Sequence, residues 1–342
     1  MAKKLSIIFL TLITLVSVFE LVGGGISKMN RYEWLPTESS YKKYPMSIIK
    51  GDLIFSDGTS IYIPSRKTID NGWGEMGSIH VVGEKLKPLP VKIEISWFSY
   101  TEDKFYSGVF SLPYEKMSNL FREGLRSPIT GEKITYQNII VGVAPAGEIS
   151  IWLMADGEVL LVANFRAKEE ELDWKSLTED EEIHRSDYIR ETLESSLSKE
   201  QFSELAQSGI PYAKLEAHGK QYSWNPQVTG AKPTHLWLKT YNGECEFIDL
   251  LKSGPSRRTL RAVPKHIDID WQDRYGTTFT GEITFNEDEA LKAYQRLSNG
   301  KPDHEFQLHI EINEKNPGID MSLKDLKYIY HFEKAVSKTY LK

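Results

Sequence analysis

Apolar and polar residues alternate strictly in two short segments of the chain. Residues 92–97 and 266–271 each place an apolar side chain at every second position. A period of two is the pattern of a β-strand that buries one face. We therefore predict a half-buried strand in each segment. The alternating side chains expected in the core are Ile93, Ile95, Trp97, Ile267, Ile269 and Trp271, and Trp152 is expected there on the same grounds.

The two segments belong to a longer internal repeat. Residues 89–97 align with residues 263–271 at a constant offset of 174, and the match continues to Phe105 and Phe279. A one-residue slip then places Gly108 on Gly281. A helix is predicted after each copy, over residues 113–123 and from Asn286 to near Gly300. In the second helix the Asn286 side chain is expected to cap and Glu289 to close a capping box.

Short apolar segments around these helices predict further strands. Asp156-Gly157 lies between two of them and is a strong signal for a two-residue hairpin. Neighbouring strands are joined too tightly for parallel crossovers. We therefore predict an α+β fold of two tandem, duplicated antiparallel-sheet units, each with one main helix. The further strands are expected at residues 46–55, 60–64, 139–143, 149–153 and 159–165 in the first copy and at residues 234–241, 244–250, 308–312, 319–323 and 327–332 in the second.

An acidic segment separates the two copies. Eight of the seventeen residues from Lys168 to His184 are Asp or Glu. Two short helices are predicted next, over residues 186–196 and 199–207, the second opened by a capping box at Ser198. We interpret the acidic run as a solvated linker face rather than an acidic docking site. The expected organisation is a leader at 1–25, a first α+β unit at 30–167, an acidic linker with two short helices at 168–212 and a second α+β unit at 213–342.

The N-terminal segment has the pattern of an export signal. Lys3 and Lys4 precede an apolar run over residues 5–19, which is followed by small residues up to Gly25. This predicts a secretory signal peptide and a periplasmic protein of the bacterial envelope. An uncleaved anchor that tethers the protein to the inner membrane through residues 5–22 is the alternative. Membrane contact is expected only through this segment, and lipidation is not predicted because no Cys follows the apolar run.

Charge and cysteine content exclude several classes of protein. The 342 residues include 42 Lys and Arg against 48 Asp and Glu, a net charge of −6. A surface of this sign repels phosphate backbones, so nucleic acid is not expected as a partner. Cys245 is the single cysteine of the sequence. It can form no intrachain disulfide and cannot by itself supply a cysteine-based zinc site.

Several stretches of the first copy carry a resemblance to a known family. They are residues 89–108, together with Gly72-Trp73-Gly74, residues 112–116, 121–124, 140–145 and 150–153, and the Asp173-Trp174 region. In these stretches the chain resembles domain-of-unknown-function family 2931, a family of exported proteobacterial proteins. The resemblance implies an envelope protein, often with a lipoprotein-type signal, and it brings no catalytic residues. The missing lipobox Cys departs from the family pattern.

Motifs that carry chemistry are missing from the sequence. It contains no nucleophile elbow, no phosphate-binding loop and no His-Glu-x-x-His pair. His266, Asp268 and Asp270 share one face of a predicted strand, a spacing that could offer metal ligands. We interpret them instead as an exposed sheet face. No metal site and no cofactor are predicted, and the catalytic residues, if any, stay unidentified.

Two loops supply the candidate binding residues. One is a glycine-rich loop with a tryptophan, whose ring either binds a partner or plugs the core. The other is an acidic segment between two strands, which we predict to be a hairpin tip. Its aromatic flank is absent from the second copy, which suggests that the loop has specialised. The candidates are Trp73 and Gly74 in the first loop, and Tyr100, Glu102, Asp103, Lys104 and Tyr106 in the second.

These features favour a non-catalytic envelope protein that binds another protein. The expected partner is a protein of the envelope or a secreted effector, in which case the chain would be an immunity-type protein. The alternative is an enzyme that acts on an envelope lipid or glycan through Glu102 and Asp103. That enzyme requires both carboxyls to converge on one point. A structural protein of the envelope would instead expose a broad apolar patch.

Overall fold

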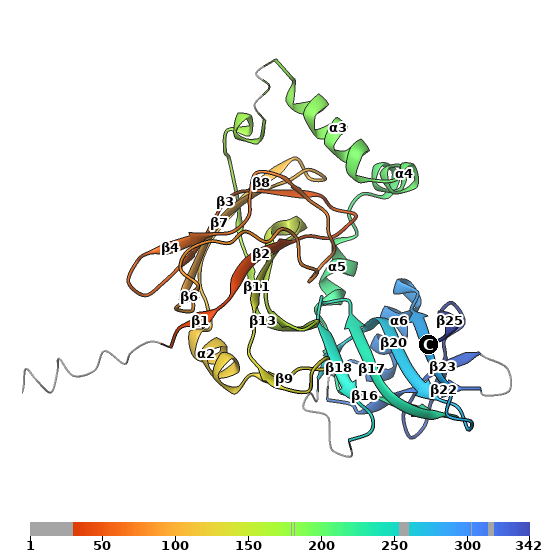
Figure 1. Ribbon diagram of the computed structural model, residues 1–342. Coiled ribbons are helices and arrows are strands. Elements are labelled where there is room, and N and C mark those ends of the chain that lie inside the picture. Colours follow the sequence, from red (N-terminus) through yellow and green to blue (C-terminus); the bar gives the residue numbers. More distant parts are fainter. Residues whose placement is uncertain (1–29, 179, 181, 253–259, 302, 314–317) are drawn as a thin grey trace, which may run out of the picture.

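The computed structural model describes residues 30–342 except 179, 181, 253–259, 302 and 314–317. The predicted leader at 1–25 therefore lies outside the described residues. Within the described ranges, no helix is both long enough and apolar enough to cross a bilayer. The protein is a mixed α+β structure made mostly of strands, with five α-helices among the described residues (Figure 1).

The strands up to β14 form two packed sheets, which we call the first unit. One sheet has the order β14-β8-β7-β3-β4, with β5 also paired to β3; the facing strands follow the order β2-β11-β12-β13. The helix α2 (Tyr114–Glu123) begins after Pro113 and ends at Gly124. The strand bounds are β2 Leu35–Ser39, β3 Met46–Ile54, β4 Ser60–Tyr62, β5 Thr68–Ile69, β7 Lys92–Ser99, β8 Lys104–Ser111, β11 Asn138–Val143, β12 Glu148–Ala155, β13 Glu158–Arg166 and β14 Lys168–Glu170.

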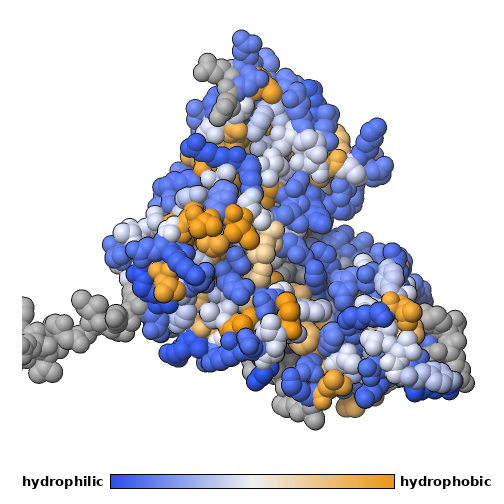
Figure 2. Space-filling model, viewed as in Figure 1, coloured by the Kyte–Doolittle hydropathy of each residue, from blue (hydrophilic) through white to orange (hydrophobic). Residues whose placement is uncertain are grey.

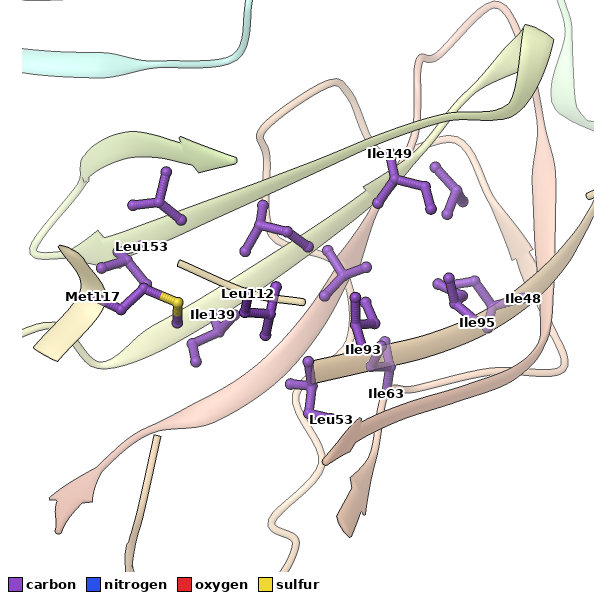
Figure 3. Close-up of a cluster of buried hydrophobic side chains, with 14 of the residues drawn as sticks. Ile48, Leu53, Ile63, Ile93, Ile95, Leu112, Met117, Ile139, Ile149 and Leu153 are labelled. Atoms are coloured by element: carbon purple, nitrogen blue, oxygen red, sulfur yellow. The ribbon is translucent and has the colours of Figure 1, made fainter. Parts of the chain in front are cut away.

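Apolar side chains from both sheets fill the space between them. Figure 3 shows Ile93 and Ile95 from β7 pointing toward Ile139 from β11 and Ile149 from β12. Met117 of α2 is fully buried against the same cluster. Burial of this apolar area is the main favourable term in folding, at roughly 25 cal/mol per Å² removed from water. The first unit therefore has its own core.

The strands from β15 onward form the second unit, around a separate core. Its four-stranded sheet has the order β16-β22-β23-β24, and its larger sheet has the order β18-β17-β20-β21-β25. The helix α6 spans Glu287–Ser298. The strand bounds are β16 Trp224–Thr229, β17 Lys232–Thr240, β18 Cys245–Asp249, β20 Pro264–Gln272, β21 Thr278–Thr284, β22 Phe306–Ile312, β23 Ile319–Lys324, β24 Ile329–His331 and β25 Val336–Leu341.

One backbone pairing joins the two units into a nine-stranded sheet. Val159 of β13 pairs with Cys245 of β18, so the sheet runs from β2 in the first unit to β25 in the second. Figure 1 shows β18 beside the end of β13. Short elements complete the chain: the antiparallel pairs β1 (Tyr32–Glu33) with β6 (Leu86–Lys87), β9 (Leu125–Arg126) with β10 (Lys133–Ile134), and β15 (Gln221–Tyr222) with β19 (Arg261–Ala262), and the 3-10 helices Pro145–Gly147 and Trp174–Leu177.

Three helices connect the units: α3 (Arg185–Ser196), α4 (Lys199–Ser208) and α5 (Tyr212–His218). The capping box predicted at Ser198 is present. Leu193 and Leu197 pack on Phe98, Tyr100 and Phe105, so the connector covers part of a sheet of the first unit. The third helix was not predicted, because its seven residues follow Pro211 directly and are too few to display a helical period.

The strands and turns predicted from alternation are confirmed. The six alternating side chains and Trp152 are all buried. Asp156 and Gly157 both have positive φ in the turn between β12 and β13. The prediction of antiparallel sheets is wrong at two places, since β2 pairs with β11, and β16 with β22, in parallel. Both parallel partners are far apart in the chain, where connection length carries no information about direction.

The predicted capping box of α6 forms only in part. The Asn286 side chain accepts the backbone N–H of Glu289, as expected for an N-cap. The Glu289 carboxylate instead accepts the backbone N–H groups of Glu333 and Lys334, at 2.8 and 3.0 Å. It thereby fixes the segment between β24 and β25, a partner that local sequence spacing could not reveal.

Candidate functional site

A pocket lies where the two units meet. Its volume is about 510 Å³, which falls within the range typical of ligand sites, about 300–1,000 Å³. Residues of the loop after β5, of the β12–β13 hairpin and of the strands β17, β18 and β20 form its wall. We call it the joint pocket. Its lining residues are Trp73, Gly74, Glu75, Met76, Met154, Gly157, Val159, Trp237, Lys239, Thr240, Gly243, Glu244, Cys245, Lys265 and Asp268.

Hydrogen bonds to β2 hold the loop that carries Trp73. The Ser39 hydroxyl donates to the Gly72 carbonyl at 2.7 Å and accepts from the Gly74 N–H at 3.0 Å. The Asn71 side chain donates to the carbonyl oxygens of Glu38 and Glu75, at 3.2 and 2.7 Å. A loop fixed at this many points can present a rigid binding surface.

Aromatic stacking places Trp73 between the core and the pocket. Its ring stacks on Tyr41, with centroids 4.5 Å apart, and meets Trp152 edge-on at 4.9 Å. The Trp152 indole N–H donates to the carbonyl of Asn242 in the second unit, at 3.1 Å. Trp73 is 6% exposed. The two interpretations of this residue are therefore compatible, since its ring is buried and also lines the joint pocket.

Two glycines allow the units to approach closely. Gly74 has φ +77° and Gly243 has φ +85°. A Cβ atom at Gly74 would lie 2.2 Å from the carbonyl oxygen of Gly243, which is closer than atoms can approach. The glycine predicted as a binding candidate thus makes a backbone contact that only glycine permits. Both glycines line the joint pocket, so the contact is part of its wall.

Lysines and carboxylates share the pocket wall. The Lys239 ammonium lies 3.3 Å from Glu75, and although burial alone would lower its pKa, Glu75 and other nearby negative groups raise it. Glu244 accepts the N–H of Leu161 at 3.1 Å. Asp268 lies 2.8 Å from the His266 ring. Burial lowers the pKa of Lys265, and the nearby lysines add to this effect.

None of the candidate residues of the hairpin tip lines the joint pocket, and three of the five contact the connector instead. Glu102 accepts from the hydroxyls of Tyr106 and Tyr212, at 3.1 and 2.8 Å. Asp103, which has φ +52°, accepts from the Arg185 guanidinium at 2.7 Å. The two carboxylates therefore have different partners. The Tyr100 hydroxyl lies 3.2 Å from that of Tyr188 in α3, and Lys104 pairs with Glu169 of β14 at 2.7 Å.

The predicted polar strand face is only partly exposed. Asp270 is buried and is contacted by Thr280, Lys342 and His235. These partners come from neighbouring strands, so the alternation of β20 alone could not show that its second face is covered at this end. Within the described ranges, no cluster of three or more His, Cys, Asp or Glu side chains could hold a metal ion.

Most of the pocket residues could not be identified from the sequence. Trp237, Lys239 and Lys265 come from two strands of the second unit, and Met154 comes from the first. Each strand carries an ordinary alternating pattern, and its contribution to a pocket depends on how the units meet. The one available signal was Trp237, a large aromatic residue on the polar face of a predicted strand.

A partly buried polar cluster lies beside the pocket and links both units with α5. The Tyr41 hydroxyl lies 3.3 Å from Nδ1 of His218, whose Nε2 lies 2.6 Å from Glu287 of α6. The His218 ring also stacks on Tyr241, with centroids 5.1 Å apart. Since Tyr41 supports Trp73, this cluster helps to position the pocket wall.

Replacing Glu148, near this cluster, by glutamine should stabilise the protein at high pH. Burial and the nearby Glu216 raise the pKa of Glu148 to about 7, against the opposing effect of Arg166. An acid with a raised folded-state pKa loses stabilisation as the pH rises from its unfolded value of 4.5 toward 7. Between pH 5 and 8, Glu148→Gln should gain about 1–2 kcal/mol in unfolding free energy relative to wild type. Urea denaturation measures this difference.

Glu115 provides the control for that measurement. It lies exposed on α2. Glu115→Gln should therefore change stability equally at pH 5 and pH 8. A Glu148→Gln variant that behaves in the same way would show that the carboxyl of Glu148 is not desolvated.

A known family model matches the first unit and most of the connector. The model of the family described as "Protein of unknown function (DUF2931)" matches residues 25–213, just over half of the chain. The chain belongs to the DUF2931 family. The match ends inside α5, so the second unit of this DUF2931 protein, including Trp237 and Lys265, lies outside the matched segment. The search of curated proteins and the search of solved structures return no match.

Proposed function

We propose that this DUF2931 protein is a non-catalytic binding protein of the bacterial envelope, and that a partner protein is anchored in the joint pocket. The joint pocket carries the proposal. It offers two tryptophans and two methionines around a few charged groups. Tryptophan is enriched among residues that dominate binding energy at protein interfaces. Methionine adapts its shape to a partner and is common on such surfaces.

The partners of the carboxylates support binding rather than catalysis. Glu75, Glu244 and Asp268 in the pocket wall each contact a group of the protein itself. Outside the pocket, Glu102 and Asp103 contact different parts of the connector. These contacts have a structural role. Within the part of the chain that the structure describes, no observation favours the enzymatic alternative.

The distribution of apolar residues on the surface tests the remaining alternative, a structural protein of the envelope. Figure 2 shows apolar residues in small separate groups among hydrophilic ones on the face in view. A structural role that depends on a broad apolar patch finds no support on this face. A discrete pocket with a polar surround is typical of a non-obligate interface.

The envelope location rests on the N-terminal sequence, with its basic residues and apolar run. The location proposed is the periplasm, with the leader cleaved or retained as an anchor. An immunity-type protein that sequesters a secreted effector is one concrete form of such a binder. A deletion strain that survives the effector of its own species unchanged would contradict this form and leave the general binding function standing.

We also propose that the two units arose by tandem duplication. The strand order β4-β3-β7-β8-β14 in the first unit corresponds to β18-β17-β20-β21-β25 in the second. The order β2-β11-β12-β13 likewise corresponds to β16-β22-β23-β24, and in each unit the first pair is parallel. The proposed boundaries are residues 30–167 and 213–342, joined by the acidic helical segment 168–212. The first three residues of that segment are β14 (Lys168–Glu170), which pairs with β8 and so belongs to the sheet of the first unit.

A buried cation recurs at the same place in each unit and supports the duplication. Lys87 donates to the Trp34 carbonyl at 2.7 Å and lies over the Trp34 ring. Arg261, at the same offset of 174, donates to the Trp224 carbonyl at 2.9 Å and lies over the Trp224 ring. Shared topology alone can arise by convergence, but a shared buried cation on a tryptophan is a more specific likeness.

Substitution of Trp237 tests the binding function. Wild-type protein immobilised on beads should retain one reproducible protein from its own envelope fraction, identified by mass spectrometry. Trp237→Ala should retain at least tenfold less of it, because the variant removes a large apolar wall of the pocket. Tyr275→Ala is the control, since Tyr275 is 77% exposed outside the joint pocket in the same unit. Equal capture by all three proteins, or capture of none, would refute the proposal.

A further inference from the structure

We infer that the joint pocket recognises a carboxylate adjacent to an apolar side chain, with Lys265 as the residue that binds the carboxylate. This inference rests on the proposed binding function and specifies the chemistry of the partner. The anchor it predicts is a short acidic and apolar segment of the partner protein. Lys265 in the pocket wall is the proposed partner of the carboxylate, and the tryptophan rings of the same wall are the proposed partners of the apolar side chain.

The charges of the pocket leave a positive group available for a ligand. Lys239 is paired with Glu75, and Asp268 is paired with His266. Across the described ranges, Lys265 makes no ion pair or side-chain hydrogen bond. The carboxylates therefore have partners within the protein, while the Lys265 ammonium of the pocket wall lacks one. An anion is the ligand that would complete this arrangement.

The surroundings of the Lys265 ammonium disfavour an unpaired positive charge, although the side chain as a whole is exposed. Desolvation lowers its pKa, and Lys42 and Lys239 lower it further, against the opposing effect of Glu75. A ligand carboxylate would replace the lost hydration and offset the repulsion between the lysines.

The carboxylate is favoured over a phosphate group by the rest of the wall. Glu75, Glu244 and Asp268 all line the same pocket. These three acids repel a dianion more strongly than a single negative charge. One carboxylate beside Lys265 thus suits the local balance of charge better than a phosphate would.

The apolar half of the ligand has a defined place. The Trp237 ring packs over Gly157, where an added Cβ would lie 3.2 Å from the ring. Trp73 and the side chains Met76 and Met154 line the pocket with it. An aliphatic or aromatic side chain that enters between the tryptophans would be shielded from water while its neighbouring carboxylate meets Lys265.

The first unit lacks the cation at this position. In the alignment of the two copies, Lys265 corresponds to Val91, which lies next to β7. The predicted carboxylate site is therefore specific to the second unit. It also falls outside the segment matched by the family model.

Two small probes test the inference without knowledge of the partner. N-acetyl-phenylalanine carries a carboxylate beside an aromatic side chain, and N-acetyl-phenylalaninamide lacks the charge. Titration of the ¹⁵N-labelled protein, followed at the tryptophan indole N–H signals, should show about tenfold tighter binding of the carboxylate probe. Lys265→Met should bind both probes equally, because it keeps the length of the side chain without its charge. Lys265→Arg should retain the preference.

The outcomes separate this inference from the proposed function. Equal binding of the two probes to wild type, binding of neither, or a preference that persists in Lys265→Met would overturn the carboxylate site. The bead experiment would still test the proposed binding function, because it does not depend on Lys265. If Lys265→Met captures the envelope partner as well as wild type does and Trp237→Ala does not, the pocket binds a partner but does not recognise a carboxylate. Loss of capture in both variants would support both statements.

Discussion

Replacing Arg261 by methionine should lower the free energy of unfolding by about 3–5 kcal/mol, the cost of breaking a buried ion pair from one side. Arg261 is 1% exposed. Its guanidinium meets both carboxylate oxygens of the buried Glu246, at 2.8 and 3.1 Å, and donates to the Trp224 carbonyl and the Asn225 side chain. Methionine fills a similar volume but leaves these acceptors without the cation. Urea denaturation of the variant measures the loss.

Two further variants show whether the buried charge is the cause. Adding Glu246→Gln to Arg261→Met should restore roughly half of the lost stability, since the neutral amide is much cheaper to bury than a carboxylate. Lys87→Met, at the corresponding place in the first unit, should cost less than Arg261→Met, because the Lys87 ammonium donates to a carbonyl rather than to a buried carboxylate. Equal losses at both positions would contradict the role of Glu246.

Strand positions could be predicted because their signal is local. Ile267, Ile269 and Trp271 alternate along one strand, and all three are buried in the second core. The α2 helix could be predicted as well, since Pro113 and Gly124 mark its ends. Such features depend on side chains within a few residues of each other. They define the elements of the fold without fixing how the elements are arranged.

Contacts between distant segments were beyond reach of the same reasoning. The parallel pairing of β2 with β11 joins residues about a hundred positions apart, and no property of either segment indicates it. The Arg261–Glu246 pair is hidden for a related reason. From the sequence alone, each charged residue would be expected on the surface. Burial of the Arg261 charge is stable only because Glu246 and the Trp224 carbonyl both accept hydrogen bonds from it.

The binding candidates chosen from the sequence include residues of only one of the two walls of the joint pocket. Trp73 and Gly74 line the joint pocket, and both were chosen because a glycine-rich loop with a tryptophan suggests a binding surface. The opposite wall, with Trp237 and Lys265, depends on how the second unit meets the first. None of the five candidate residues of the hairpin lines this pocket, and three of them, Tyr100, Glu102 and Asp103, contact the connector instead. Their charges and aromatic rings carry a signal of contact that does not by itself distinguish an internal partner from an external one.

Gly243→Ala should destabilise the protein by about 2–4 kcal/mol, because it adds a steric conflict at the joint to the strain of a positive φ. A Cβ atom at Gly243 would lie 2.9 Å from the Gly74 Cα and 3.0 Å from the Trp152 ring. The loop that carries Trp73 would have to move away from the second unit. The variant should therefore also retain less of the envelope partner in the bead experiment.

Gly58 isolates the part of this effect that belongs to the joint. It has φ +84° against +85° at Gly243, in the corresponding turn between β3 and β4, and a Cβ added there would meet nothing within 4 Å. Gly58→Ala thus carries the backbone strain alone, about 1 kcal/mol. The difference in unfolding free energy between the two variants measures the close approach of Gly74 and Gly243. Equal losses of stability and of partner capture in the two variants would show that the approach of Gly74 to Gly243 neither holds the units together nor shapes the pocket.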